Sequence, residues 1–548
     1  MPRENDEKTP LHGDEEKSKG PTLLQDPVNW ICTLVQTYSW KLLVMVAATN
    51  HLLKGFVAGG GDSGLLGAPM EFMFKFYKVD GGRMQVYMAI ASCPWALKPL
   101  IGLLSDSLPI YGFRKMPYII VTSSAGLCSA LALGAFGYQL TLGVVVACLF
   151  VVFLMVATAD LLVEAKQSAE VKSSAELGPD FFLFTWLGIV IGMILATICA
   201  GPLIQYASPH ACYLVAVPFI AISLWPTVMN YIGEQRLQDG ETSCARITSN
   251  LKRHPEMSSL CIGMGFLLLA ITVVTFTVRE DAERMQALVG IGGAAFLLSG
   301  VALFIRSEIA LPMIFWFLLS ACPKVDGALF YFYTDSEDIY PGGPHFSAWM
   351  YTTGLGLAGM FGVLTGYLSG SILFKTWRYP FILILTVPCR ALIRLLLLPV
   401  LWRWNIDDMY WVFPIEFLSS MLFSWSWLPK QVMGAHMTPS GNEATMLALS
   451  AGTFNLGNII SSFLGCWLLS SFKICADGDS GDATALKNLW RPYLISVLAP
   501  VLVLVVLPLC IPNKLQTEVL LTEHPESCTY GALSRRLTTT RVDNDSQP

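Results

Sequence analysis

The sequence predicts an all-α membrane protein with about fourteen transmembrane helices. Of its 548 residues, 54% are hydrophobic and only 14% are charged, whereas a soluble domain carries about 25% charged residues. The apolar residues form repeated runs of about 20, the length that crosses roughly 30 Å of hydrocarbon. Because hydrocarbon offers backbone amides no hydrogen-bond partner, we expect each run to be helical.

The apolar runs follow one another along the whole chain between two polar tails. They cover residues 41–66, 82–104, 117–139, 141–164, 180–204, 210–232, 258–279, 285–305, 308–333, 346–369, 379–402, 409–434, 446–472 and 489–511. An even number of spans places both tails on one side of the membrane, and the basic residues of the short loops favour the cytoplasm for that side.

Two segments of the chain resemble each other in where they lie relative to the apolar runs. Asp160–Lys166 ends one apolar run before a polar loop and another long helix, and Lys430–His436 does the same later in the chain. Secondary transporters are often built from two such halves with the binding site between them. Aligning the two segments divides the chain into two bundles, an inserted pair and cytosolic connections. The expected parts are a tail (1–39), a six-helix bundle (40–232), a loop (233–257), an inserted helix pair (258–307), a second six-helix bundle (308–511) and a tail (512–548).

Several basic residues fall near the middle of the predicted spans. A charge at that depth costs about 2.5–3.5 kcal/mol on insertion scales, so each one is a functional hypothesis. Arg390 and Arg394 lie one helical turn apart, hence on one face, and Lys54 and Lys324 lie at similar depth. Bases outnumber acids there, so we expect these four residues to bind an anionic solute. The alternative is that the arginines pair with Glu416 and only hold the bundle together.

Two acids are candidates for proton coupling. Asp62 lies in the glycine-rich segment 59–64, and Asp326 follows Pro323. Burial raises the pKa of a carboxyl group and a nearby cation lowers it, so either residue could bind a proton near neutral pH. A proton-coupled carrier needs such a group.

Other charged residues lie near the predicted cytoplasmic ends of the helices. We expect them to form an inner gate and ion pairs that lock the bundle. They are Lys98, Asp106, Arg114, Asp160, Glu164, Lys430 and Glu443.

Several classes of function lack their motifs. The sequence has no GxxxxGK[ST] segment, no HExxH and no HxxxH, and its 14 cysteines form no CxxC pair. No basic patch interleaved with aromatic residues suggests nucleic acid binding. We therefore expect no catalytic residue, no cofactor, no metal site and no nucleic acid partner.

One segment carries a family resemblance. PWALKPLIGLLSDSLPIYGFRKMPY, residues 94–118, resembles the helix 2–3 signature of the folate–biopterin transporter family and is similar to the major-facilitator loop motif G-x-x-x-D-x-x-G-R-[RK]. The segment 439–445 with 455–457 resembles the late loop of that family. The likeness covers most of residues 40–511. The chain departs from the family at Glu164, where a second aspartate is usual.

The resemblance implies a major-facilitator fold, here two six-helix bundles plus an inserted pair, that works by alternating access. We expect the protein to be a monomer. The resemblance also implies transport of folate or pterins, with proton symport, and we expect the protein to lie in the plasma membrane. Trypanosomatid-like members include carriers of S-adenosylmethionine, so this or a nucleoside-like solute is the alternative within the family. The two carboxylates of folate suit the Arg390 and Arg394 face, since guanidinium binds carboxylate in a bidentate manner. From other classes, a channel and a membrane transferase using Asp160 or Glu164 stay open.

Overall fold

The computed structural model describes residues 26–59, 63–173, 177–236, 255–278, 281–437, 443–479, 482–516, 518, 520–521 and 529. Regular structure in these ranges is helical, apart from isolated bridges. Ten of the described helices are long and apolar enough to cross a membrane, and a bent pair makes an eleventh candidate. Asp62 and the side chain of Glu443 lie outside the described part of the chain.

The N-terminal group of helices begins earlier than the sequence suggested. Pro27 at the first helical position and Asp26, which accepts a hydrogen bond from the Asn29 amide, start a helix within the segment expected to be a tail. That helix meets the next at an angle of 107°, where Ser39 has a positive φ of 69°. The group consists of α1 (Pro27–Tyr38), α2 (Trp40–Val46), η1 (Ala47–Val57), α3 (Pro69–Phe76), α4 (Gly81–Ala91), α5 (Cys93–Ala96), α6 (Lys98–Ser107), α7 (Met116–Phe136), η3 (Gly137–Gln139), α8 (Leu142–Ser173), α9 (Gly178–Tyr206) and α10 (Pro209–Val228).

The C-terminal helices include a broken span. Proline lacks the amide that a continuous helix needs, and the apolar run 308–333 breaks around Pro323, so Lys324 and Asp326 lie next to unwound backbone. The elements are α12 (Pro255–Thr277), α13 (Ala282–Phe304), α14 (Ser307–Ser320), α15 (Asp326–Thr334), η5 (Met350–Leu355), α16 (Gly356–Leu373), α17 (Tyr379–Leu395), α18 (Leu398–Leu401), α19 (Asp408–His436), α20 (Glu443–Ser471), α21 (Asp482–Leu486), α22 (Trp490–Val503), η6 (Leu504–Val506) and α23 (Leu507–Cys510).

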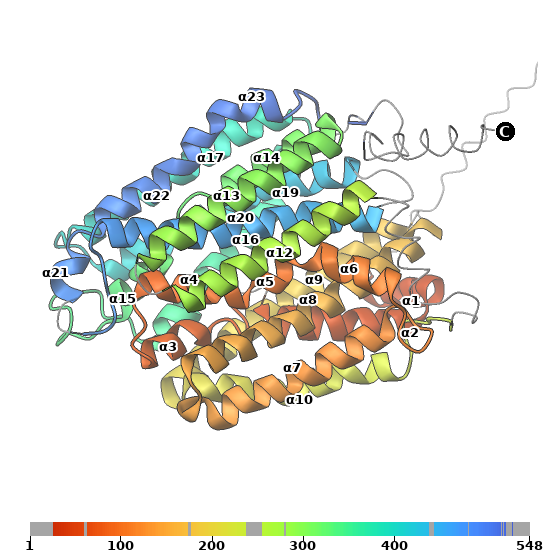
Figure 1. Ribbon diagram of the computed structural model, residues 1–548, viewed down its shortest axis with the longest axis horizontal. Coiled ribbons are helices and arrows are strands. Elements are labelled where there is room, and N and C mark those ends of the chain that lie inside the picture. Colours follow the sequence, from red (N-terminus) through yellow and green to blue (C-terminus); the bar gives the residue numbers. More distant parts are fainter. Residues whose placement is uncertain are drawn as a thin grey trace, which may run out of the picture.

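The long helices run side by side in two groups (Figure 1). In the first group, α7 packs on α8 and α10, and η1 packs on α9 and α10; in the second, α19 packs on α16 and α17, and α14 on α20. The groups meet where α4, α5 and α6 pack on α20 and where α9 packs on η5 and α16. The pair α12 and α13 packs against α6 and α20. We call the end that carries α15 and α21 the far end, and the end that carries α1 the tail end.

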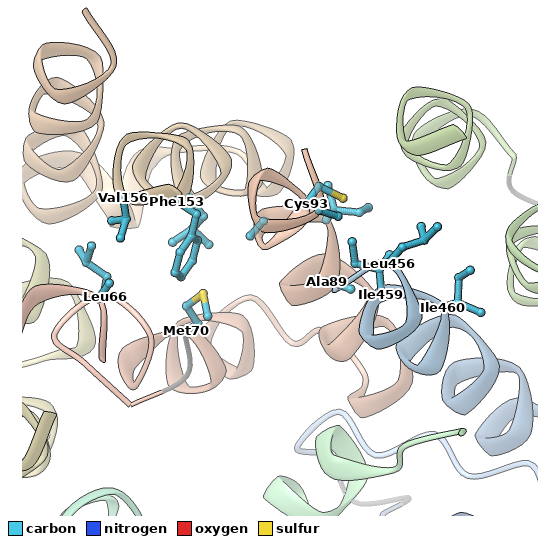
Figure 2. Packing of buried hydrophobic residues seen from close by; sticks show 14 of the residues in the cluster. Leu66, Met70, Ala89, Cys93, Phe153, Val156, Leu456, Ile459 and Ile460 are labelled. Carbon is cyan, nitrogen blue, oxygen red and sulfur yellow. The ribbon is translucent and has the colours of Figure 1, made fainter. Parts of the chain in front are cut away.

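Tight apolar packing holds the contact between the groups. Ala89 and Cys93 lie beside Leu456 and Ile459 of α20, while Met70 lies beneath α8 in the same view (Figure 2). Backbones also approach closely at glycines, as in many membrane helix contacts. A Cβ atom on Gly327 would lie 1.9 Å from the carbonyl oxygen of Gly81 in the other group.

Candidate functional site

The first group of helices encloses a three-residue ion cluster. The Asp160 carboxylate on α8 is buried and lies 2.9 Å from the Lys54 ammonium of η1 and 2.6 Å from the Lys98 ammonium of α6. Each ammonium also lies near an indole ring, Lys54 at 5.5 Å from Trp186 and Lys98 at 4.9 Å from Trp95. One carboxylate therefore balances two ammonium groups within a single group of helices.

The cluster combines residues for which the sequence predicted different roles. Lys54 was expected to bind solute, and Asp160 and Lys98 to form a gate. Glu164, one turn beyond Asp160 on α8, acts electrostatically on Lys54 as well. With Glu164 included, the two bases face two acids.

The second group of helices holds the two arginines at mid-depth. The Arg390 Nε donates a hydrogen bond of 3.3 Å to the Ser419 hydroxyl, and its guanidinium lies 4.9 Å from the Phe423 ring centroid. The Tyr493 hydroxyl donates to the Arg394 carbonyl at 2.7 Å. Both arginine side chains are half-buried. Within the described residues neither arginine forms an ion pair of 4.0 Å or less.

Acids surround the arginines at longer range. Glu416 and Asp326 both interact electrostatically with Arg390 and Arg394, and Glu416 accepts a hydrogen bond of 3.0 Å from the Ser420 hydroxyl. Asp326 begins α15 and is exposed. A carboxylate that is exposed where a membrane helix breaks is positioned to meet water or a solute.

Two more features complete this interior. The Lys324 ammonium lies 3.4 Å from the Asn458 side-chain oxygen, so its charge meets a neutral partner. Glu71, from the first group, forms a hydrogen bond with the Tyr351 hydroxyl, and Asp326 interacts with Tyr351 electrostatically. Around the interface of the two groups, Lys324, Arg390 and Arg394 therefore lie among three acids, but neither arginine forms an ion pair of 4.0 Å or less in the described residues.

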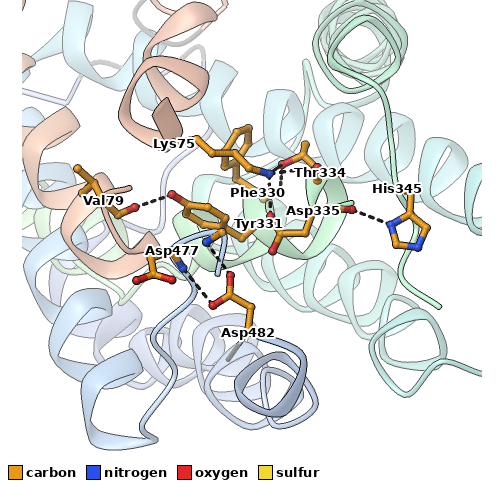
Figure 3. A network of polar contacts seen from close by, with 10 residues as sticks. Lys75, Val79, Phe330, Tyr331, Thr334, Asp335, His345, Asp477 and Asp482 are labelled. Carbon is orange, nitrogen blue, oxygen red and sulfur yellow. Dashed lines mark hydrogen bonds and ion pairs between the residues drawn. The ribbon is translucent and has the colours of Figure 1, made fainter. Parts of the chain in front are cut away.

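A polar network joins the two groups at the far end (Figure 3). The Lys75 ammonium lies 2.7 Å from the Asp335 carboxylate and also donates to Thr334, and the Tyr331 hydroxyl donates to the Val79 carbonyl at 2.6 Å. The Gly81 amide donates to the Ala476 carbonyl at 2.8 Å. These bonds hold the far end closed. The sequence did not indicate these bonds, since Lys75 and Asp335 both fall outside the apolar runs.

Acidic residues flank this closure. The Asp482 carboxylate accepts hydrogen bonds from the backbone amides of Asp477 and Gly478, at 3.2 and 2.7 Å. Burial raises the pKa of Asp482 to about 6, and the negative charges of Asp335 and Asp477 contribute to the rise. The protonation of Asp482 therefore changes close to neutral pH, beside the ion pair that closes the far end.

At the tail end the motif loop is tied to its own group. The Glu234 carboxylate accepts hydrogen bonds from the backbone amides of Arg114, Lys115 and Met116, at 2.6, 3.0 and 2.9 Å, where α7 begins. Burial lowers the pKa of Lys115, although Asp106 and Glu234 oppose that shift. Asp106 and Arg114 thus lie at the tail end.

The sequence comparison assigns the chain to a family. Residues 60–523 match the model of the BT1 family. The chain belongs to this family. Among its relatives, "Probable folate-biopterin transporter 2" of Arabidopsis thaliana is 24% identical over 88% of this chain and 84% of its own length. The "Folate-biopterin transporter" of Synechocystis is 23% identical, covering 78% and 75%, and "Folate transporter 1" of Plasmodium falciparum is 21% identical, covering 79% and 74%.

Solved structures of transporters share the fold of this BT1-family chain. A peptide transporter POT in complex with sulfate superimposes with a TM-score of 0.61 at 13% identity, covering 87% of this chain and 96% of the other. The nucleoside transporter NupG gives a TM-score of 0.53 at 12% identity, covering 86% and 99%. These likenesses show that the chain has an all-helical fold like that of these two solved structures. Relatives and structural neighbours alike are named transporters, so the family is one of carriers and not of enzymes.

Proposed function

We propose that this BT1-family protein is a secondary-active carrier of folate or pterins that works by alternating access. Its relatives carry the names of folate and folate–biopterin transporters. The strongest support for the proposal comes from Arg390 and Arg394. Both side chains are half-buried near the middle of their span, and neither forms a close ion pair in the described part of the chain. Two such guanidinium groups favour a solute that brings carboxylates.

The proposal includes the finer architecture. Fourteen spans would form a bundle at 40–232, an inserted pair at 258–307 and a second bundle at 308–511. The separate packing of α7, α8 and α10 and of α16, α17 and α19 supports this division. The protein would act as a monomer in the plasma membrane with both tails in the cytoplasm. The far-end bonds then close the outer side, and solute would leave toward the tail end.

In this proposal four bases supply the charge that attracts the solute. They are Lys54, which shares Asp160 with Lys98, together with Lys324, Arg390 and Arg394. Asp106, Arg114, Asp160, Glu164, Lys98 and Glu443 would form or support the inner gate. The competing view is that Glu416 simply neutralises the arginines. Glu416 instead accepts a hydrogen bond from Ser420, and no short Glu416–arginine pair occurs in the described residues.

Proton coupling would use a membrane acid. Asp326 is exposed where the helix breaks, and it acts on both arginines, so its protonation would alter the attraction of the site for an anion. Asp62, the other candidate, remains part of the proposal from its glycine-rich sequence alone.

A cationic solute is the second candidate. Asp326 and Glu416, with Glu71 from the other group, place three carboxylates around the interface. Such acids would attract S-adenosylmethionine or a related nucleoside-like cation. The anion is favoured because neither arginine forms an ion pair of 4.0 Å or less in the described residues.

Uptake into proteoliposomes tests the proposal. Purified protein should accumulate radiolabelled folate or biopterin when a pH gradient is imposed, and Asp326→Asn should abolish the gradient-driven part. Arg390→Lys should weaken folate binding by about 1.5–3 kcal/mol, because lysine cannot replace the planar fork, and should affect neutral biopterin much less. Arg378→Lys, an exposed change at the start of the same helix, is the matched control. Uptake of S-adenosylmethionine but not of folate or biopterin would refute the anion proposal.

A further inference from the structure

Lys430 is an ammonium group surrounded by aromatic rings. Its Nζ lies 3.0 Å from the Phe454 ring centroid, 3.8 Å from that of Trp427 and 6.0 Å from that of Trp316. In the described part of the chain Lys430 makes no ion pair. Contact with aromatic faces offsets only about 2 kcal/mol of the cost of burying a cation. An anion would offset more, since a desolvated charge is stable mainly beside its opposite.

The ammonium points into the protein interior. A lysine near the end of a membrane helix normally extends to the interface. Lys430 lies near the tail-end terminus of α19, but Trp316 and Phe454 lie well inside α14 and α20. At 1.5 Å per residue these rings are about 15 Å from the tail-end starts of their helices. Helical side chains lean toward the helix N-terminus, which for α19 is the far end.

A strip of side chains along α19 connects Lys430 with the arginine site. Ser419, Phe423, Trp427 and Lys430 are spaced by three or four residues, so they share one face of the helix. The steps along the strip are short. The Arg390 guanidinium lies 4.9 Å from the Phe423 centroid, the Phe423 and Trp427 centroids are 5.6 Å apart, and Lys430 lies 3.8 Å from Trp427. A cation thus lies at each end of an aromatic pair.

We propose that Lys430 is a second anion-binding point, so that the strip from Arg390 to Lys430 binds an elongated solute with two separated negative groups. The apolar faces of Phe423 and Trp427 would contact the part of the solute that lies between its two negative groups. This inference rests on the proposed function, and in that context the solute is a folate with more than one glutamyl residue. The two carboxylates of a single glutamyl group are too close together to occupy both ends of the strip. Lys430 is then the residue that sets the preference for tail length.

Equilibrium binding to the purified, detergent-solubilised protein tests the inference. The probes are folate with one and with three glutamyl residues, and biopterin, which has no carboxylate. Wild-type protein should bind the triglutamate roughly 10- to 100-fold more tightly than the monoglutamate, the range of a charged hydrogen bond. Lys430→Gln should remove this preference and leave monoglutamate and biopterin binding within about threefold. Lys430→Arg should retain it, and Lys473→Gln, an exposed far-end lysine, should behave as wild type.

Three results would overturn the inference. Wild-type protein could show no preference for the longer tail. Lys430→Gln could weaken binding of all three probes equally, which would mark Lys430 as structural. It could also change only the transport rate and leave every affinity unchanged, as expected of a gate residue.

Failure of the proposed function has a different signature, because wild-type protein would then bind neither folate nor biopterin. The strip would in that case be tested with p-aminobenzoylglutamate and its triglutamate, which carry the same charges without the pterin ring. Loss of a triglutamate preference in Lys430→Gln would still support the second anion point, and its absence in wild type would refute it.

Discussion

Replacing Asp160 by asparagine should destabilise the protein strongly. Among the ion pairs of the described residues, no other Asp→Asn or Glu→Gln change should cost as much stability. The change removes the carboxylate that lies 2.9 Å from Lys54 and 2.6 Å from Lys98 and leaves both ammonium groups in place. The side chains are 2% exposed for Asp160, 9% for Lys98 and 18% for Lys54, so water can screen little of the resulting repulsion. Removing one partner of such a buried pair costs about 3–5 kcal/mol.

Thermal unfolding in detergent measures the effect, since the midpoint falls as the free energy of unfolding falls. Glu170→Gln is the matched control. Glu170 lies on the same helix and pairs with Lys166 at 2.6 Å, but the two side chains are 35% and 28% exposed. An exposed pair one turn apart contributes about 0.3–0.5 kcal/mol, so this variant should unfold close to the wild-type midpoint.

A double variant tests whether unpaired charge is the cause. Adding Lys98→Met to Asp160→Asn removes one of the two opposed ammonium groups. The double variant should therefore be more stable than Asp160→Asn alone, by about 0.5–3 kcal/mol, the usual range for coupled neighbours. Simple addition of the two losses, or equal effects of Asp160→Asn and Glu170→Gln, would refute the reasoning.

Three further predictions concern the two ends of the molecule. The folded-state pKa of Asp482, about 6, lies above the usual aspartate value of about 3.9. The protonated Asp482 side chain therefore stabilises the far end at pH 4, and this stabilisation is lost as the pH rises through 6. Thermal unfolding midpoints of the wild type should show this pH dependence, and those of Asp482→Asn should not. Gly327→Ala places a methyl group 1.9 Å from the Gly81 carbonyl, so spin labels at the exposed positions 78 and 337 should move apart, whereas an unchanged distance would mean that the contact adapts locally. Asp106→Asn should change the maximal uptake rate more than the affinity, because a gate residue biases the populations of states; equal losses of equilibrium substrate binding in Asp106→Asn and Arg390→Ala would contradict a gate role.

The sequence was sufficient for the helical architecture because the relevant signal is local. A run of apolar residues long enough to cross hydrocarbon must form a helix wherever it lies in the bundle. The break around Pro323 was not predicted, because residues 308–333 form one continuous apolar run in the sequence. The motif at 94–118 identified the family, which the match over 60–523 confirmed. Even so, the helix α1 at Pro27–Tyr38 went unnoticed within a segment interpreted as a polar tail.

Which charges meet was decided only by the tertiary structure. Lys54 and Asp160 are 106 positions apart and Lys75 and Asp335 are 260 apart, so no local pattern could pair them. The sequence showed that cations at depth need partners, but an ion pair forms only between side chains on helices that become neighbours. For this reason Lys54 pairs with the Asp160 carboxylate, whereas Lys430 lies among aromatic rings. The cost of burying each charge follows from residue type and depth, and the means of offsetting it follow from helix packing.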